Sequence, residues 1–126
     1  MLAFLRKNPS LTTEEFINYY ETKHIPLIVS VSGDTLPTTY KRRYFHQGKA
    51  ASATEAFGVL HHPSDGSSAV PYDAVTELGL PDKQVSETWV AKMRANEAVV
   101  ADELVFLDQR KMSLIVVQEF ETIREQ

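Results

Sequence analysis

The 126-residue sequence contains no cysteine, which excludes disulfide bonds, thiolate metal sites and a cysteine nucleophile. Positive charge is also scarce, because 13 Lys and Arg residues stand against 17 Asp and Glu residues and the formal net charge is −4. Binding to nucleic acid depends on clustered Lys and Arg that displace counterions, so we expect no nucleic-acid partner. No apolar run approaches the roughly 20 residues of a membrane-spanning helix, so we expect no membrane partner.

Sequence motifs for the common cofactors are missing as well. We find no glycine-rich phosphate loop, no dinucleotide fingerprint and no G-x-S-x-G. The adjacent histidines His61 and His62 do not have the i, i+4 spacing of helical metal ligands, and no carboxylate triad is near them. We therefore predict neither a cofactor nor a metal. The segment "MLAFLRKNPS" places its charges after its apolar run, opposite to a signal peptide, so we expect a cytoplasmic protein.

The composition that remains suits one folded domain. Hydrophobic residues make up 43% of the chain and charged residues 24%, which is typical of globular proteins. A chain of this size can bury a hydrophobic core. We therefore expect a single domain over residues 1–126.

The first part of the chain predicts a strand followed by a helix. Residues 1–6 form a short apolar run that ends at a turn signal, as in a strand. Thr12 and Glu15 have the spacing of a capping box, which predicts a helix from about Thr13. Pro26 disfavours helical geometry at the residue before it, so we expect the helix to end or kink there.

The rest of the chain predicts two strands, further helices and a last strand. Residues 38–47 and 72–80 are rich in β-branched and aromatic residues, and Asp82 has the position of a helix cap. A second helical stretch follows, and the apolar residues 111–120 predict the last strand. Residues 48–70 are rich in Gly, Ala and Ser, and are predicted to be a lid, a binding segment or a disordered loop.

The order strand, helix, strand, strand, helix, strand predicts an α+β, ferredoxin-like split βαβ fold. Such a fold (βαββαβ) has a four-stranded antiparallel sheet with its helices on one face. The last strand has too few polar positions for a sheet face in contact with water. We therefore expect a homodimer in which two sheets face each other and close a dimeric α/β barrel.

His24 is the most informative single residue. It follows Phe16, Ile17 and Tyr20 at helical spacings, so it belongs to the buried side of the helix. Two interpretations stay open. Either His24 is the polar centre of a site, or it is a buried histidine bonded to a backbone carbonyl near Pro26.

Four segments together resemble a known family. In order they are "LTTEEFINYYETKHIPLI", "YKRRYFH", "YDAVTELGL" and "ADELVFLD". They resemble the EthD family of dimeric α/β-barrel proteins, particularly short members of fungal aromatic polyketide pathways. The resemblance implies a cofactor-independent protein that binds an aromatic, polyketide-derived small molecule in each subunit. It further implies a lyase, as a decarboxylase or dehydratase, or a cyclase in secondary metabolism, with His24 and the pair Asp102 and Glu103 at the site.

The resemblance and the residue chemistry together suggest roles. Imidazole transfers protons near neutral pH, so His24 is the candidate general acid/base, and Asp102 is its candidate catalytic partner. The residues expected to bind the substrate are Tyr20, Tyr40, Arg42, Tyr44, His46, Trp89, Glu103 and Phe106. Arg42 is expected to supply a cation for a substrate carboxylate. The alternative is that the aromatic residues and Arg42 pack between the sheet and the helices. For Asp102 and Glu103, the alternative is a solvated acidic face of a helix.

Two other functions remain open at this stage. The protein could bind or stabilise a reactive aromatic intermediate without chemistry, in which case the backbone would hold His24 away from the ligand. It could instead be a cofactor-free monooxygenase acting on an electron-rich phenol, which would consume dioxygen.

Overall fold

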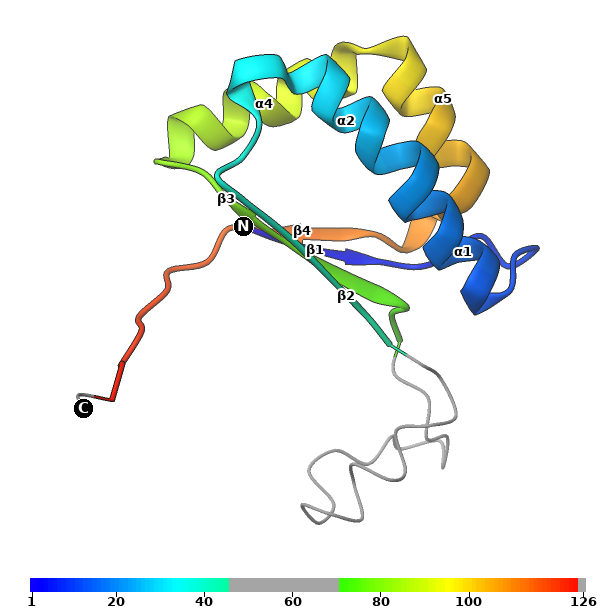
Figure 1. Cartoon of the computed structure of the whole chain (residues 1–126), viewed down its shortest axis with the longest axis horizontal. Coiled ribbons are helices and arrows are strands. Elements are labelled where there is room, and N and C mark those ends of the chain that lie inside the picture. Colours follow the sequence, from blue (N-terminus) through cyan, green and yellow to red (C-terminus); the bar gives the residue numbers. More distant parts are fainter. Residues whose placement is uncertain (46–70, 125–126) are drawn as a thin grey trace.

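Four antiparallel strands form a single sheet in the computed structural model (Figure 1). They are β1 (Leu2–Leu5), β2 (Thr39–Tyr44), β3 (Ala74–Gly79) and β4 (Ser113–Ile115). Their order across the sheet is β2-β3-β1-β4, and each neighbouring pair is antiparallel. The helices cover one face of this sheet (Figure 1). The predicted ferredoxin-like α+β fold is therefore confirmed.

The structure describes residues 1–45 and 71–124. The predictions for His46, for the pair His61 and His62 and for the loop at residues 48–70 lie outside these described residues.

The first helical segment begins at the predicted capping box. The Thr12 Oγ1 accepts a hydrogen bond from the Glu15 amide at 3.1 Å, and the Glu15 Oε1 accepts one from the Thr12 amide at 3.0 Å. Helix α1 (Thr13–Tyr19) starts there and continues into a π-helical turn, η1 (Tyr20–His24). Helix α2 (Ile25–Ser32) and a short 3₁₀ turn, η2 (Gly33–Thr35), complete the segment.

The helix continues through Pro26, although we expected it to end or kink there. Ile25 has helical dihedral angles, φ −60° and ψ −47°, and its amide donates to the Tyr20 carbonyl, five residues earlier. Proline cannot donate a backbone hydrogen bond, and its ring clashes with the carbonyl of the preceding turn of an α-helix. The wider π turn just before Pro26 accommodates that ring, so α2 begins with Pro26 in its first turn.

The second helical segment consists of α4 (Lys83–Ala95) and α5 (Glu97–Phe106). Helix α4 begins as predicted, because the Asp82 Oδ1 accepts from the Val85 amide at 2.8 Å. Asn96 ends α4 and caps α5, since its side-chain oxygen accepts from the Val99 amide at 3.1 Å. A 3₁₀ turn, η3 (Gln109–Lys111), then leads into β4.

The last strand is shorter than the predicted segment 111–120. Only Ser113–Ile115 forms β4, and Ile115 pairs with Leu2, the first residue of β1. Among the described residues, β1 pairs with none that follow Ile115, and these residues are exposed, as with Phe120 at 86%. An apolar sequence alone does not make a strand without a neighbouring backbone to bond.

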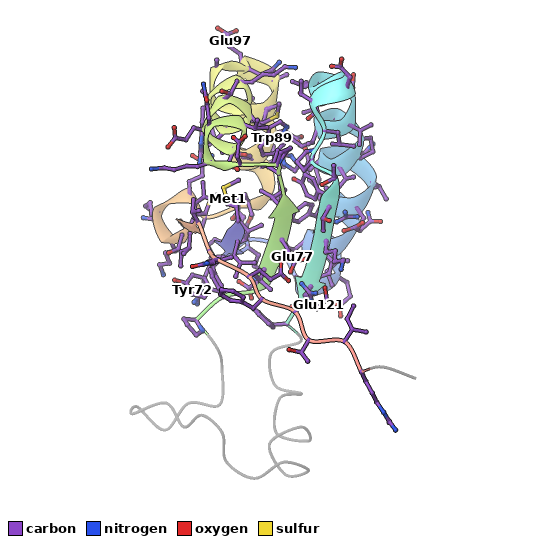
Figure 2. The ribbon with its side chains drawn as sticks, turned by 90° about the vertical axis from the view of Figure 1, so that its left-hand side faces the viewer. Met1, Tyr72, Glu77, Trp89, Glu97 and Glu121 are labelled. Atoms are coloured by element: carbon purple, nitrogen blue, oxygen red, sulfur yellow. The ribbon has the colours of Figure 1, made fainter. Side chains whose placement is uncertain are left out.

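The core between sheet and helices has two clusters. The first contains Leu5, Phe16, Tyr20, Ala74, Phe106 and Leu107. The second contains Ile28, Leu78, Trp89, Met93 and Val99. Trp89 lies between the α4–α5 segment and the α1–α2 segment (Figure 2). Its indole Nε1 donates to the Ser32 Oγ at 3.0 Å. This bond ties the two helical segments together above the sheet.

The capping box gives a direct test of how the first helix is stabilised. Replacing Thr12 by Ala removes the acceptor for the Glu15 amide, and we expect a loss of about 1 kcal/mol in the free energy of unfolding. Thr12→Ser is the matched control, because serine keeps the hydroxyl and caps as well as threonine. Urea denaturation measures both. Equal stability of Thr12→Ala and the unmodified protein would contradict this account of the helix start.

Candidate functional site

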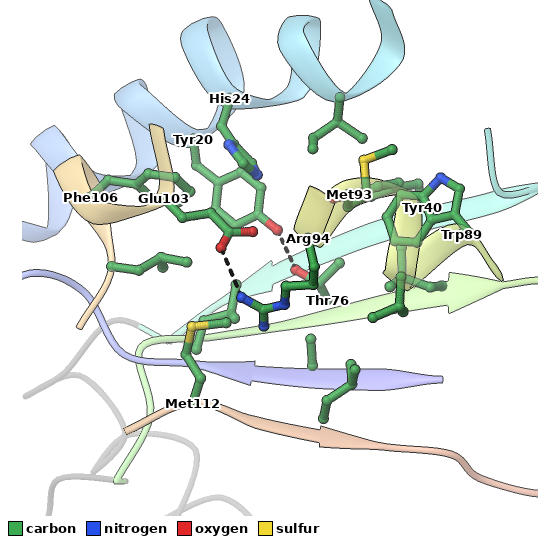
Figure 3. Close-up of a pocket in the computed structure, with 17 residues that line it drawn as sticks. Tyr20, His24, Tyr40, Thr76, Trp89, Met93, Arg94, Glu103, Phe106 and Met112 are labelled. Atoms are coloured by element: carbon green, nitrogen blue, oxygen red, sulfur yellow. Dashed lines mark hydrogen bonds and ion pairs between the residues drawn. The ribbon is translucent and has the colours of Figure 1, made fainter. Parts of the chain in front are cut away.

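A cavity of about 80 Å³ lies between the sheet and the helices, where the two core clusters meet (Figure 3). Most of its lining is apolar and includes Trp89, Met93 and Phe106. Its polar lining residues are Tyr20, His24, Tyr40, Thr76, Arg94 and Glu103. Few polar groups in an apolar cavity are typical of a site that binds small organic molecules.

His24 lines this cavity from the end of the π turn, with its side chain only 5% exposed. Its Nδ1 lies 2.8 Å from the Asp102 Oδ2. The rings of Tyr20 and Phe106 pack against the imidazole, with centroids at 5.5 and 4.7 Å. Asp102 does not line the cavity itself. Because its carboxylate bonds Nδ1, Nε2 is the ring nitrogen of His24 that has no hydrogen bond within the described part of the chain. The structure thus brings His24 and Asp102, the candidate general acid/base and its candidate partner, into direct contact.

Tyr19 is part of the same group, and sequence reasoning missed it. Its hydroxyl donates to the Asp102 Oδ1 at 2.6 Å, so both carboxylate oxygens of Asp102 are engaged. The bond to this carboxylate raises the pKa of Tyr19 to about 12. In an α-helix, residues five apart such as Tyr19 and His24 are not neighbours. The π turn between them is the feature that brings both to one carboxylate, and the spacing alone did not predict it.

Two phenols face the cavity in their neutral form. The Tyr20 hydroxyl lies 2.7 Å from the Thr76 Oγ1, and burial raises the pKa of Tyr20 to about 12 (Figure 3). Burial also raises the pKa of Tyr40 well above its ordinary value. Both residues are among the predicted substrate contacts, and both line the cavity. As neutral phenols, they can offer O–H donors to a ligand oxygen.

Glu103 and Arg94 meet at one wall of the cavity. The Arg94 Nη1 lies 3.4 Å from the Glu103 Oε2 (Figure 3). The same oxygen also accepts from the Gln109 Nε2 at 3.1 Å. Burial raises the pKa of Glu103, against the opposing effect of the Arg94 charge. Glu103 was a predicted site residue, whereas Arg94 was not. Arg94 stands in the last turn of an ordinary helix, where a basic residue is expected for the helix dipole alone.

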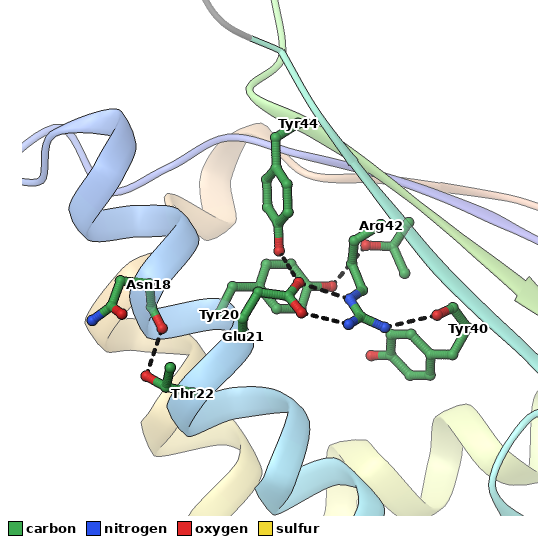
Figure 4. A network of polar contacts seen from close by, with 8 residues as sticks. Asn18, Tyr20, Glu21, Thr22, Tyr40, Arg42 and Tyr44 are labelled. Atoms are coloured by element: carbon green, nitrogen blue, oxygen red, sulfur yellow. Dashed lines mark hydrogen bonds and ion pairs between the residues drawn. The ribbon is translucent and has the colours of Figure 1, made fainter.

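The structure does not bring Arg42 and Tyr44 to the cavity. Both side chains contact Glu21 instead (Figure 4). The Arg42 guanidinium makes two bonds to the Glu21 carboxylate, from Nε at 2.9 Å and from Nη2 at 2.5 Å. The Tyr44 hydroxyl donates to the same carboxylate, and the Arg42 bonds lower the pKa of Glu21. The Arg42 charge is thus already neutralised next to the π turn. The sequence did not indicate this pairing, because Glu21 has no spacing relation to β2.

The described residues hold no group of three His, Asp or Glu side chains that could bind a metal ion. Nor does any helix within residues 1–45 and 71–124 have the length and apolar character needed to cross a membrane.

The buried carboxyl group of Glu103 gives a test of the cavity's electrostatics. Because its pKa is raised in the fold, Glu103 contributes stability below its unfolded value of 4.5 and loses it as the pH rises through the folded value. We therefore expect Glu103→Gln to be more stable than the unmodified protein at pH 7. The gain should shrink as the pH falls towards 4.5. Thermal melts across this range measure it, and Glu97→Gln on the exposed start of the same helix is the control. A destabilised Glu103→Gln at pH 7 would contradict the assignment.

Comparison with known proteins identifies the family. The model of the EthD domain matches residues 8–110, which include the π turn, α4, α5 and the polar lining of the cavity. A search of curated proteins found no match. The match covers most of the chain and agrees with the resemblance seen in the sequence. The chain belongs to the EthD domain family.

Proposed function

We propose that the protein is a cofactor-independent enzyme that modifies aromatic polyketides, acting as a decarboxylase, dehydratase or cyclase. The observation that carries this proposal is the position of His24. The imidazole lines a mostly apolar cavity while Asp102 holds its Nδ1 at 2.8 Å. A carboxylate in this position fixes the ring and stabilises the protonated form during proton transfer.

His24, Tyr20 and Tyr40 each have a role in the proposed reactions. In a decarboxylation, the C–C bond to the carboxylate breaks, carbon dioxide leaves and the electron pair stays on the substrate as an enolate or a ring carbanion. His24 then donates the Nε2 proton to that carbon. Neutral phenols at Tyr20 and Tyr40 would donate hydrogen bonds to the developing oxyanion. In a dehydration, His24 would remove a proton from carbon and return it to the leaving hydroxide, so that water departs.

A specific observation favours catalysis over simple binding. A binding module would hold His24 by the backbone, whereas its Nδ1 is bonded to the Asp102 side chain.

The cavity of about 80 Å³ is smaller than the roughly 300 to 1,000 Å³ of typical ligand pockets, so a polycyclic ligand requires the cavity wall to move. Met93 and Met112 in that wall are unbranched and flexible side chains, which suits such movement.

Turnover with and without His24 tests the proposal. Aromatic polyketide acids are incubated with the protein and its variants, under air and under nitrogen, and product masses are measured. We expect a loss of carbon dioxide or water that does not need oxygen and falls by about 10²- to 10⁴-fold in His24→Ala. Asp102→Asn should also slow turnover, because it keeps the shape but removes the negative charge behind the imidazole.

The matched control is Asp34→Asn, the same change at an exposed position in η2. It should turn over at the normal rate. Ligand retained without any mass change would support the binding module instead. A product that contains an added oxygen atom and forms only under air would support a monooxygenase.

We also propose that the protein is a homodimer joined through the outer sheet face. Side chains alternate along a strand, so Ala3 and Leu5 line the inner face while Leu2 and Phe4 point outward. Val75 and Ile115 are opposite Phe4 and Leu2 in the register and join this outer face. At the β2 edge the face becomes charged, with Lys41 and Arg43 at 4.0 and 3.6 Å from Glu77. The face thus has an apolar part on β1 and β4 that is bordered by charged residues on β2 and β3. Apolar and charged areas side by side are typical of a protein interface.

Light scattering tests the dimer. We expect the unmodified protein to have twice the chain mass of 14.2 kDa, and Ile115→Arg to be monomeric because it places a charge on the apolar part of the face, next to Leu2. Leu104→Arg is the control, since Leu104 is 59% exposed on α5, away from the sheet. If the unmodified protein were monomeric, or Ile115→Arg remained dimeric, this interface would be rejected.

A further inference from the structure

Arg94 has no role in the proposed chemistry, although it lines the cavity (Figure 3). It lies near the end of α4, and its side chain is 53% exposed. A residue that both lines the cavity and contacts solvent stands at the cavity's opening. Arg94 therefore meets a ligand on entry.

Arg94 is also the only Lys or Arg among the described residues that line the cavity. The other polar lining groups are hydroxyls, the imidazole of His24 and the carboxyl group of Glu103. Arg42, which we expected to supply the cation, is bonded to Glu21 elsewhere. A negatively charged ligand in this cavity thus has one permanent cation available to it.

The hydrogen bond between Arg94 and Glu103 is weak enough for Arg94 to exchange it for a bond to a ligand. Its Nη1 lies 3.4 Å from the Glu103 Oε2, beyond the usual N–H to oxygen range of about 2.7 to 3.2 Å. Glu103 has a second donor in Gln109 at 3.1 Å, so it stays hydrogen-bonded if the guanidinium turns away. The guanidinium has five N–H donors, and within the described part of the chain this long contact is the only side-chain hydrogen bond it makes.

We propose that Arg94 is the anion-binding residue of the cavity and selects aromatic carboxylates by exchanging the Glu103 carboxylate for that of the ligand. This inference rests on the proposed function and names its substrate class. The aromatic part of the ligand then occupies the apolar cavity beside Trp89 and Phe106, and its carboxylate stays at the opening. Arg94 is a specificity residue that contacts the ligand, whereas His24 transfers the proton.

Binding of a matched pair of probes tests the proposal. Calorimetry gives the Kd of 2-naphthoate and of its neutral analogue 2-naphthamide, and quenching of Trp89, the single tryptophan, reports binding in the cavity. We expect Arg94→Met to weaken naphthoate by about tenfold or more and naphthamide by no more than about twofold, because only the acid loses a charge-assisted bond. Arg94→Lys should keep part of the preference for the acid.

Two further variants control the comparison. Lys83→Met removes the same charge from an exposed position of the same helix, and should leave both Kd values unchanged. Glu103→Gln removes the competing carboxylate and should tighten naphthoate without affecting naphthamide.

The ratio of the two Kd values within one variant is independent of small changes in folding. Equal weakening of both probes by Arg94→Met, an unchanged naphthoate Kd, or no binding of either probe to the unmodified protein would overturn the proposal. If the preference for naphthoate over naphthamide depends on Arg94 but the protein turns over no substrate, only the proposed lyase activity is rejected. Turnover that needs His24, with acid and amide bound alike, would reject only the role of Arg94.

Discussion

The pairing of buried His24 with Asp102 is the interaction on which the site depends. The His24 side chain is 5% exposed, and a buried charge without a partner costs several kcal/mol. Proton transfer at this position therefore requires an opposite charge close by. Asp102 supplies that charge at 2.8 Å, and Tyr19 holds its other oxygen at 2.6 Å. The π turn makes the arrangement possible, because it presents both Tyr19 and His24 to α5. One irregular turn thus connects Pro26, the histidine and the carboxylate.

Around this pair, the fold separates neutral from charged polar groups. Inside the cavity, burial raises the pKa values of Tyr20 and Tyr40 and keeps these phenols as neutral donors. Outside it, Arg42 and Glu21 neutralise each other next to the same π turn. Apart from His24, the acidic and basic side chains among the described lining residues are Glu103 and Arg94, and they meet where the cavity opens. The lining therefore places neutral hydroxyl donors inside the cavity and this ion pair at its opening.

The sequence predicted those parts that depend on local signals. The capping box at Thr12, the cap at Asp82 and the order of strands and helices all follow from neighbouring residues, and the structure confirms them. The family resemblance predicted that His24 and Asp102 belong to one site, and the two side chains are in contact in the structure. The last strand was predicted too long, because its length is set by its partner β1 and not by its own apolar residues.

The remaining differences arise from contacts between distant residues. Tyr40 and Arg42 are two residues apart in β2 and therefore share a face of the sheet. Only Tyr40 lines the cavity, because Glu21 holds the Arg42 side chain outside it. Tyr19 and Arg94 could not be recognised from spacing. Tyr19 shares the Asp102 carboxylate with His24 because of a π turn that the sequence does not signal. Arg94 is in the last turn of a helix, where a basic residue is favourable in any helix. Short-range patterns locate the elements, whereas the polar pairs between them require the folded arrangement.

The most direct test of the account is whether a ligand in the cavity contacts the free nitrogen of His24. Protein labelled with ¹⁵N-histidine is titrated with 1-hydroxy-2-naphthoate, and the two His24 ring nitrogens are followed by long-range NMR, with His24→Gln used for assignment. We predict that the Nε2 signal shifts on binding while the Nδ1 signal keeps the signature of its hydrogen bond to Asp102. Ligand binding that leaves both His24 signals unchanged would contradict the assignment of this histidine as the proton-transfer group.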